Sequence, residues 1–156
     1  MITFSGAYDC KMDPKGRIVL PSRLKSRLPE SGSEKLFILR GFKKCLTIYT
    51  QSLWEEKLAS FATVSDYDEE GQDIIRSLTF GMAEEELDGQ GRFSLNKKLI
   101  QYAGLGNDIL IVGVGKLIEI WNPEEYDAQL IQDRKKLQAM ARNLFDKPIQ
   151  PSDSTQ

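Results

Sequence analysis

The spacing of hydrophobic and polar residues changes several times along the chain. Residues 17–20, "RIVL", and 92–95, "RFSL", alternate between the two kinds, which is typical of short strands with one buried face. Two longer apolar runs, 36–50 and 109–121, are each interrupted by glycine and lysine and predict β-hairpins. Their apolar and aromatic residues are expected in the core or at a subunit contact: Phe37, Ile38, Leu39, Ile48, Tyr49, Ile109, Leu110, Ile111, Ile120 and Trp121.

Helix start and stop signals follow these strands. Pro21 and Ser22 predict a short helix ending near Pro29. Asn96 is placed to cap the helix "KKLIQYA", and Gly104 is placed to end it. Capping-box patterns, "SLWE" at 52–55 and "NPEE" at 122–125, predict a helix after each hairpin.

Further helices are predicted outside these units. Residues 66–78 are expected to be helical with an interruption at Gly71. The acidic run "SDYDEEGQD", residues 65–73, is typical of a solvated helix face, with a partner-binding segment as the alternative. A helix beginning at Pro123 is expected to reach about Phe145, with Tyr126, Leu130, Leu137, Ala141 and Leu144 near one stripe. The tail 147–156 is predicted to be disordered.

The chain contains a tandem repeat. Residues 5–24 align with 80–99 at a shift of 75 positions, and the hairpins and following helices align at a shift of 72, which matches Gly41 with Gly113. Two copies of one unit favour packing about a pseudo-two-fold axis. The predicted organisation is a first repeat at 5–60, a helical connector at 61–79, a second repeat at 80–130 and a C-terminal helix at 131–146.

Each copy carries an aspartate-glycine turn directly before its alternating strand. In "DPKG", Asp13, Pro14 and Gly16 are residues that a type I turn favours. In "DGQG", Asp88 and Gly91 keep the two outer positions. We therefore interpret Asp13, Gly16, Asp88 and Gly91 as turn scaffold, with an arginine at the exposed start of each strand.

Composition narrows the chemistry. The 156 residues include no histidine, so the usual general base and imidazole metal ligand are missing, and no P-loop or dinucleotide-binding glycine motif is present. Cys10 and Cys45 form no C-x-x-C pair and are interpreted as free buried thiols. We expect no enzyme activity, metal or cofactor. The sequence also predicts no membrane segment, which favours a cytoplasmic protein.

Charge is distributed unevenly between the copies. The whole chain has a net charge of −2, yet residues 9–27 hold six cations against two carboxylates, a net charge of +4. Residues 84–98 hold three cations against four carboxylates, a net charge of −1. A contact with an anionic polymer and a merely solvated basic surface are both compatible with the first pattern.

The duplicated turn, with "DPKGRIVLP" first and "LDGQGR" second, resembles the MraZ family over about residues 5–130. The resemblance implies an α+β fold in which two tandem SpoVT-AbrB-type repeats form a swapped-hairpin β-barrel decorated by helices, with subunits assembled into a homo-oligomeric ring. It implies a nucleoid-associated transcriptional regulator that binds double-stranded DNA. The implied DNA target is short direct repeats in the promoter of the division and cell-wall gene cluster that contains its own gene.

The resemblance also implies site residues. The DNA-contacting motif corresponds to Lys15 and Arg17, with Lys11, Arg23 and Arg27 as neighbours. Because Gln90 stands where the first copy has Lys15, the second turn is not expected to contact DNA directly. Arg92 is interpreted as a surface or interface ion pair with nearby glutamates, and a contact with phosphate or a neighbouring subunit is the alternative. A competing hypothesis is an antitoxin-like or scaffold protein whose basic turn pairs with an acidic protein partner.

Overall fold

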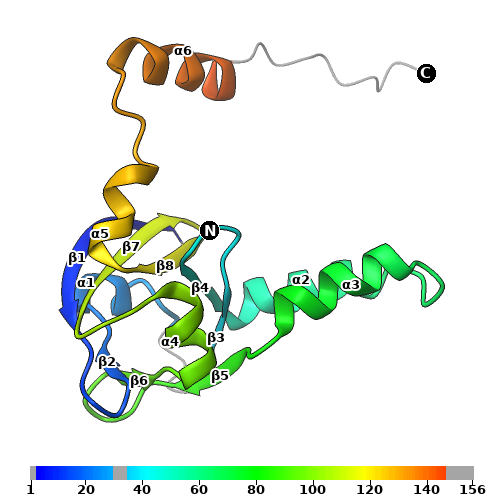
Figure 1. The fold of residues 1–156 in the computed structure, drawn as a ribbon, viewed down its shortest axis with the longest axis horizontal. Coiled ribbons are helices and arrows are strands. Elements are labelled where there is room, and N and C mark those ends of the chain that lie inside the picture. The colour runs from blue at the N-terminus through cyan, green and yellow to red at the C-terminus, as the bar shows by residue number, and fades with distance from the viewer. Residues whose placement is uncertain (1–2, 30–34, 147–156) are drawn as a thin grey trace. The chain divides into compact units, whose positions relative to one another are not determined.

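The structure is a computed structural model that describes residues 3–29 and 35–146. It divides into one compact unit, residues 1–125, and a second, residues 126–156. The fold is of the predicted α+β class, with antiparallel strand pairing and six α-helices in the described ranges (Figure 1). The tail predicted to be disordered, residues 147–156, lies outside the described residues.

Both copies supply four strands. The first copy contains β1 (Phe4–Lys11), β2 (Arg17–Val19), β3 (Lys35–Arg40) and β4 (Leu46–Thr50), and the second contains β5 (Ala83–Glu86), β6 (Arg92–Ser94), β7 (Asp108–Gly115) and β8 (Leu117–Trp121). The helices are α1 (Ser22–Lys25), α2 (Gln51–Phe61), α3 (Glu69–Thr79), α4 (Lys97–Ala103), α5 (Pro123–Tyr126) and α6 (Arg134–Phe145), with a 3-10 turn at Asp127–Gln129. Both predicted hairpins, β3–β4 and β7–β8, are confirmed.

The strand order interleaves the two copies. A six-stranded sheet has the order β1-β7-β8-β4-β3-β5, and β2 and β6 form a separate two-stranded sheet. Exchanging each strand with its counterpart in the other copy leaves both orders unchanged, as the predicted pseudo-two-fold relation requires. Because β1 and β5 end the larger sheet and β2–β6 is a separate ladder, linked to the residue after β1 by the Met12–Ile18 bridge, these pairings do not by themselves close a barrel, and closure stays a prediction.

The strand register shows which residues of the two copies are structurally equivalent. Ile18 pairs with Phe93, its own counterpart, at the centre of the β2–β6 pair. The expected match of Gly41 with Gly113 is wrong by one position. Arg40 pairs with Leu46 across five intervening residues, whereas Gly113 pairs with Ile118 across four, so the first hairpin holds one residue more between these equivalent pairs.

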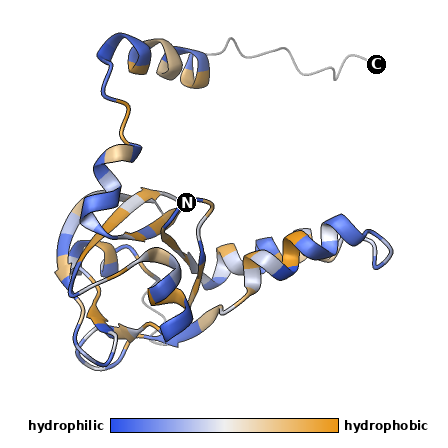
Figure 2. Ribbon diagram, viewed as in Figure 1, coloured by the Kyte–Doolittle hydropathy of each residue, from blue (hydrophilic) through white to orange (hydrophobic). Residues whose placement is uncertain are grey.

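Apolar residues from both copies form one main core. Figure 2 shows hydrophobic residues concentrated along the strands. Leu24 of α1 and Leu99 of α4 are 2% and 1% exposed, so each short helix is held to the core by a buried leucine. Burial of one such side chain contributes about 1.5–3 kcal/mol. Of the ten residues expected in the core, Tyr49 and Leu110 are half-buried and the others are buried.

Helix boundaries depart from the sequence prediction in the first copy. The helix expected to end near Pro29 is only four residues long, because α1 ends at Lys25 and turns follow. Helix α2 begins one residue before Ser52. Thr50 is its N-cap, and its hydroxyl accepts a hydrogen bond from the Leu53 N–H at 3.4 Å. The capping box at 52–55 is therefore wrong, since a threonine at the strand end already performs this role.

Gly71 does not interrupt the connector helix. It lies in the first turn of α3, where its N–H donates to the capping carboxylate of Asp68 at 2.9 Å. A methyl group at Gly71 would lie 2.6 Å from a methyl of Val64, so close packing explains the glycine.

The single helix expected from Pro123 to about Phe145 is wrong. Helix α5 passes into the 3-10 turn, and α6 begins only at Arg134. The Asp133 carboxylate accepts hydrogen bonds from the N–H groups of Lys135 and Lys136, which starts a new helix. The stripe from Tyr126 to Leu144 is thus divided between separate elements.

Candidate nucleic-acid interface

The first turn is built around the carboxylate of Asp13. The Gly16 N–H donates to the Asp13 carbonyl at 2.9 Å, closing the predicted β-turn. One carboxylate oxygen accepts from the backbone N–H groups of Lys15 at 2.9 Å and Arg17 at 2.8 Å. Gly16 has a φ of +78°, a conformation that favours glycine. The interpretation of Asp13 and Gly16 as turn scaffold fits these contacts.

The second turn repeats this geometry. The Gly91 N–H donates to the Asp88 carbonyl at 2.9 Å, and Gly91 has a φ of +75°. The Asp88 carboxylate accepts from the N–H groups of Gln90 and Arg92, both at 2.9 Å. Replacement of the proline by Gly89 therefore leaves the hydrogen bonding of the turn intact.

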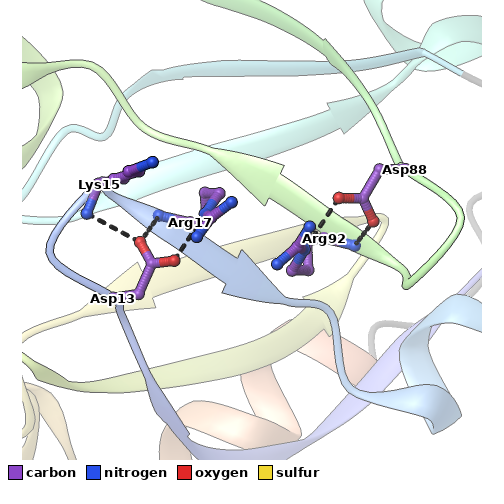
Figure 3. A network of polar contacts seen from close by, with 5 residues as sticks. All are labelled: Asp13, Lys15, Arg17, Asp88 and Arg92. Atoms are coloured by element: carbon purple, nitrogen blue, oxygen red, sulfur yellow. Dashed lines mark hydrogen bonds and ion pairs between the residues drawn. The ribbon is translucent and has the colours of Figure 1, made fainter.

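Each turn aspartate also binds its arginine side chain. Arg17 Nε donates to Asp13 Oδ2 at 2.6 Å, and Arg92 Nε donates to Asp88 Oδ2 at 2.9 Å (Figure 3). The hydrogen bond from the Arg92 N–H, reinforced by its side chain, lowers the pKa of Asp88 to about 2, and the matching bond from Arg17 lowers the pKa of Asp13. Arg17 is therefore held in place by the aspartate of its own turn, and among the described residues its side-chain contact uses only Nε.

Strand pairing places the two arginines on one face. Arg17 pairs with Ser94, and Val19 pairs with Arg92. Because side chains alternate along a strand, these four residues face outward while Ile18 and Phe93 enter the core. Figure 3 shows both arginine side chains between the two turns. We call this outward surface, Arg17, Val19, Arg92 and Ser94, the ribbon face.

The ion pair expected between Arg92 and nearby glutamates has a different partner. Among the described residues, the salt bridge of Arg92 is with Asp88 of its own turn. The repeated four-residue spacing from aspartate to arginine was visible in the sequence, and it is the signal that predicts this pair in both copies.

A family comparison agrees with the two-copy architecture. The model described as "MraZ protein, putative antitoxin-like" matches residues 3–75 and 79–147. The chain belongs to the MraZ family. A relative from Cytophaga hutchinsonii, named "Transcriptional regulator MraZ", is 38% identical over 138 residues, which cover 88% of this chain and 91% of the relative.

In this MraZ-family chain, the fold separates the cations that are consecutive in sequence. The Leu20 N–H donates to the Gly91 carbonyl at 3.0 Å, and the Leu95 N–H donates to the Gly16 carbonyl at 2.9 Å. Helix α1, which follows Leu20, therefore begins beside the second turn. The basic segment 9–27 thus contributes charge to both turns.

The predicted site residues occupy different surroundings. Lys15 is exposed on the first turn, and Lys11 forms an exposed salt bridge with Asp108 at the end of the β1–β7 pairing. Arg23 and Arg27 are exposed on and just after α1. Lys15 lies on the first turn and Arg17 begins β2 directly after it, whereas Arg23 and Arg27 belong to the segment that starts at the second turn.

Sequence reasoning missed Lys25 as an individual site residue. A methyl group at Gly91 would lie 3.4 Å from Lys25 Nζ, so the lysine side chain crosses the second turn. In the sequence, Lys25 contributed only to the net charge of the basic segment 9–27. At the shift of 75, Lys25 corresponds to Ile100, a charged residue to an apolar one. This difference could have indicated from the sequence that the two turns have unlike neighbours.

Other chemistry finds little support in the described residues. Both cysteines are free, and burial raises the pKa of the Cys45 thiol to about 12, so it is not a ready nucleophile. Across residues 3–29 and 35–146, no group of three metal-ligating side chains comes together. Within the same ranges, no helix has the length and apolar character required to cross a bilayer.

Proposed function

We propose that this chain is a DNA-binding transcriptional regulator that contacts the duplex through its ribbon face. The observation that carries the proposal is the presentation of Arg17 and Arg92 on one outward surface of a two-stranded ribbon. Such a ribbon fits the major groove of B-DNA. The regulatory name of the Cytophaga hutchinsonii relative supports the same function.

The two cations of the first turn have different roles in this proposal. Asp13 holds Arg17 through Nε, which leaves the two terminal guanidinium nitrogens to reach the O6 and N7 acceptors of guanine. Lys15 carries a mobile charge suited to a backbone phosphate. Lys11, Arg23 and Arg27 add attraction to phosphate at greater distance, and Arg92 takes part beside Arg17.

The family resemblance supports a more detailed proposal. The target is a set of short direct repeats in the promoter of the division and cell-wall gene cluster that contains the protein's own gene. Subunits assemble into a ring, so that several first turns engage adjacent repeats and gain avidity. The two copies close into a swapped-hairpin barrel within each subunit, and the protein works at the nucleoid without catalysis.

Titration of fluorescent DNA from upstream of its gene tests the role of Arg17. Arg17→Lys keeps the charge but loses the planar fork, so it should retain salt-sensitive binding while losing preference for the upstream sequence over scrambled DNA. The expected loss is about 1–3 kcal/mol of discrimination for each guanine contact. The turn should survive, because Asp13 still accepts backbone hydrogen bonds from Lys15 and residue 17.

Arg76→Lys is the matched control. Arg76 forms an exposed ion pair with Asp73 on α3, away from the ribbon face. It should leave both affinity and sequence preference unchanged. Equal sequence preference in Arg17→Lys and wild type would refute the assignment of Arg17 to base recognition.

The family description also supports a second candidate, an antitoxin-like interaction protein. In that case the basic turn would pair with an acidic protein. A purified stoichiometric complex that depends on Lys15 and Arg17, together with no salt-sensitive preference for the upstream DNA, would favour it over the regulator.

A further inference from the structure

Lys25 is carried to the second turn by contacts of its own helix. The Leu20 N–H donates to the Gly91 carbonyl, and α1 begins two residues later at Ser22. Leu24, 2% exposed, anchors the helix to the core. Lys25, the last residue of α1, is therefore fixed at its backbone close to a turn from the other repeat.

The lysine side chain lies against Gly91. A methyl group at that glycine would be 3.4 Å from Nζ, 3.8 Å from Cδ and 4.0 Å from Cε of Lys25. The bare glycine thus leaves space for the end of the lysine chain. Lys25 is exposed, and within the described residues its ammonium has no ion pair.

At the first turn, the place that Lys25 takes beside Gly91 is occupied by an apolar side chain next to Gly16. A methyl group at Gly16 would lie 2.7 Å from the Leu95 carbonyl oxygen and 3.4 Å from Cδ1 of Ile100, the residue that corresponds to Lys25 when the shift of 75 is continued one position past the aligned segment. The first turn has a lysine of its own, Lys15, and an isoleucine across it. The second has uncharged Gln90 and a lysine against its glycine, so each turn has one lysine in addition to its aspartate-bound arginine.

We propose that Lys25 supplies the second turn with the phosphate-binding cation that Gln90 lacks. This inference rests on the proposed function and extends the DNA-binding surface to a site assembled from both repeats. Arg92 faces outward on the ribbon, and Lys25 adds a flexible point charge at its turn. The ligand is a backbone phosphate of duplex DNA, so the contribution of Lys25 is independent of base sequence.

The test is fluorescence anisotropy with the full chain and duplex DNA from upstream of its gene, at salt concentrations from about 50 to 200 mM. Each phosphate contact contributes about 0.9 to the slope of log affinity against log salt. Lys25→Gln should make that slope less steep by about 0.9 for each engaged turn. The affinity deficit of the variant relative to wild type should therefore be about threefold smaller at 200 mM salt than at 50 mM. The loss should be equal on scrambled DNA.

Lys116→Gln is the matched control. It makes the same charge change in the connection after Gly115, which pairs with Phe4 at the opposite end of the β1–β7 ladder from Lys11. Its salt slope should equal that of wild type. Thermal melting of both variants should match wild type, since each altered side chain is exposed.

A second substitution tests the site rather than the residue. Gln90→Lys in the Lys25→Gln background restores a cation at the position equivalent to Lys15 and should return the slope to the wild-type value. If wild type binds upstream DNA but Lys25→Gln matches Lys116→Gln, the inference is overturned and the proposed function stands. If wild type has no salt-sensitive DNA binding, both are overturned.

Discussion

The two turns share their internal hydrogen bonds but differ in what surrounds them. In both, an aspartate accepts two backbone N–H groups and the Nε of an arginine. A methyl group at Gly16 would lie 2.7 Å from the Leu95 carbonyl oxygen, whereas one at Gly91 would meet only the end of Lys25. Duplication thus preserved the geometry of the turn, while packing made one turn confined and the other open.

The most severe way to break this comparison is to remove the contact on which both turns depend. Phe93 is 2% exposed and pairs with Ile18 at the centre of the ribbon. Phe93→Ala should destabilise the protein by about 3–5 kcal/mol through lost burial and a cavity. Val19→Ala, on the exposed side of the same ribbon, should change stability by less than about 0.5 kcal/mol. Urea denaturation measures both, and equal effects would contradict the assigned faces.

Alanine substitutions at Gly16 and Gly91 distinguish the free-energy cost of a positive φ from the cost of a steric clash. Either substitution places a side chain at positive φ, at a cost of about 1–2 kcal/mol. Gly16→Ala also forces a methyl group against the backbone of Leu95, so its total should reach about 2–4 kcal/mol. Gly91→Ala should cost only the conformational part, because Lys25 can move. Denaturant midpoints that rank Gly91→Ala as the more damaging change would refute this difference.

The smallest expected effect is acid dependence at the second turn. The Asp88 pKa of about 2 lies below the usual value near 3.9, so ionised Asp88 contributes stability that is complete above about pH 5. That contribution is lost as pH falls through the folded pKa. Asp88→Asn keeps an acceptor oxygen but not the charge, and its melting temperature should differ from wild type constantly between pH 5 and 7 and less at pH 3. A difference that grows on acidification would contradict the sign.

Helix ends could be predicted from the sequence where only one nearby residue can act as the cap. Asn96 accepts a hydrogen bond from the Leu99 N–H at 3.0 Å and Gly104 ends α4 at a φ of +61°, both as the sequence predicted. The capping box at Ser52 and the continuous helix after Pro123 failed, because Thr50 and Asp133 compete as caps. Several polar residues within a few positions can start a helix, and packing selects among them.

The candidate site also has some features that the sequence predicts and others that depend on packing. The sequence by itself determined the repeat, the aspartate-glycine turns and the alternation that buries Ile18 and Phe93, because these follow from local backbone and side-chain periodicity. Only the tertiary structure decided that Arg92 lies beside Arg17 and that Lys25 crosses Gly91, because the strands of the two copies interleave. Charge counted along the chain could not reveal this, since α1 follows one turn in sequence and packs beside the other in space.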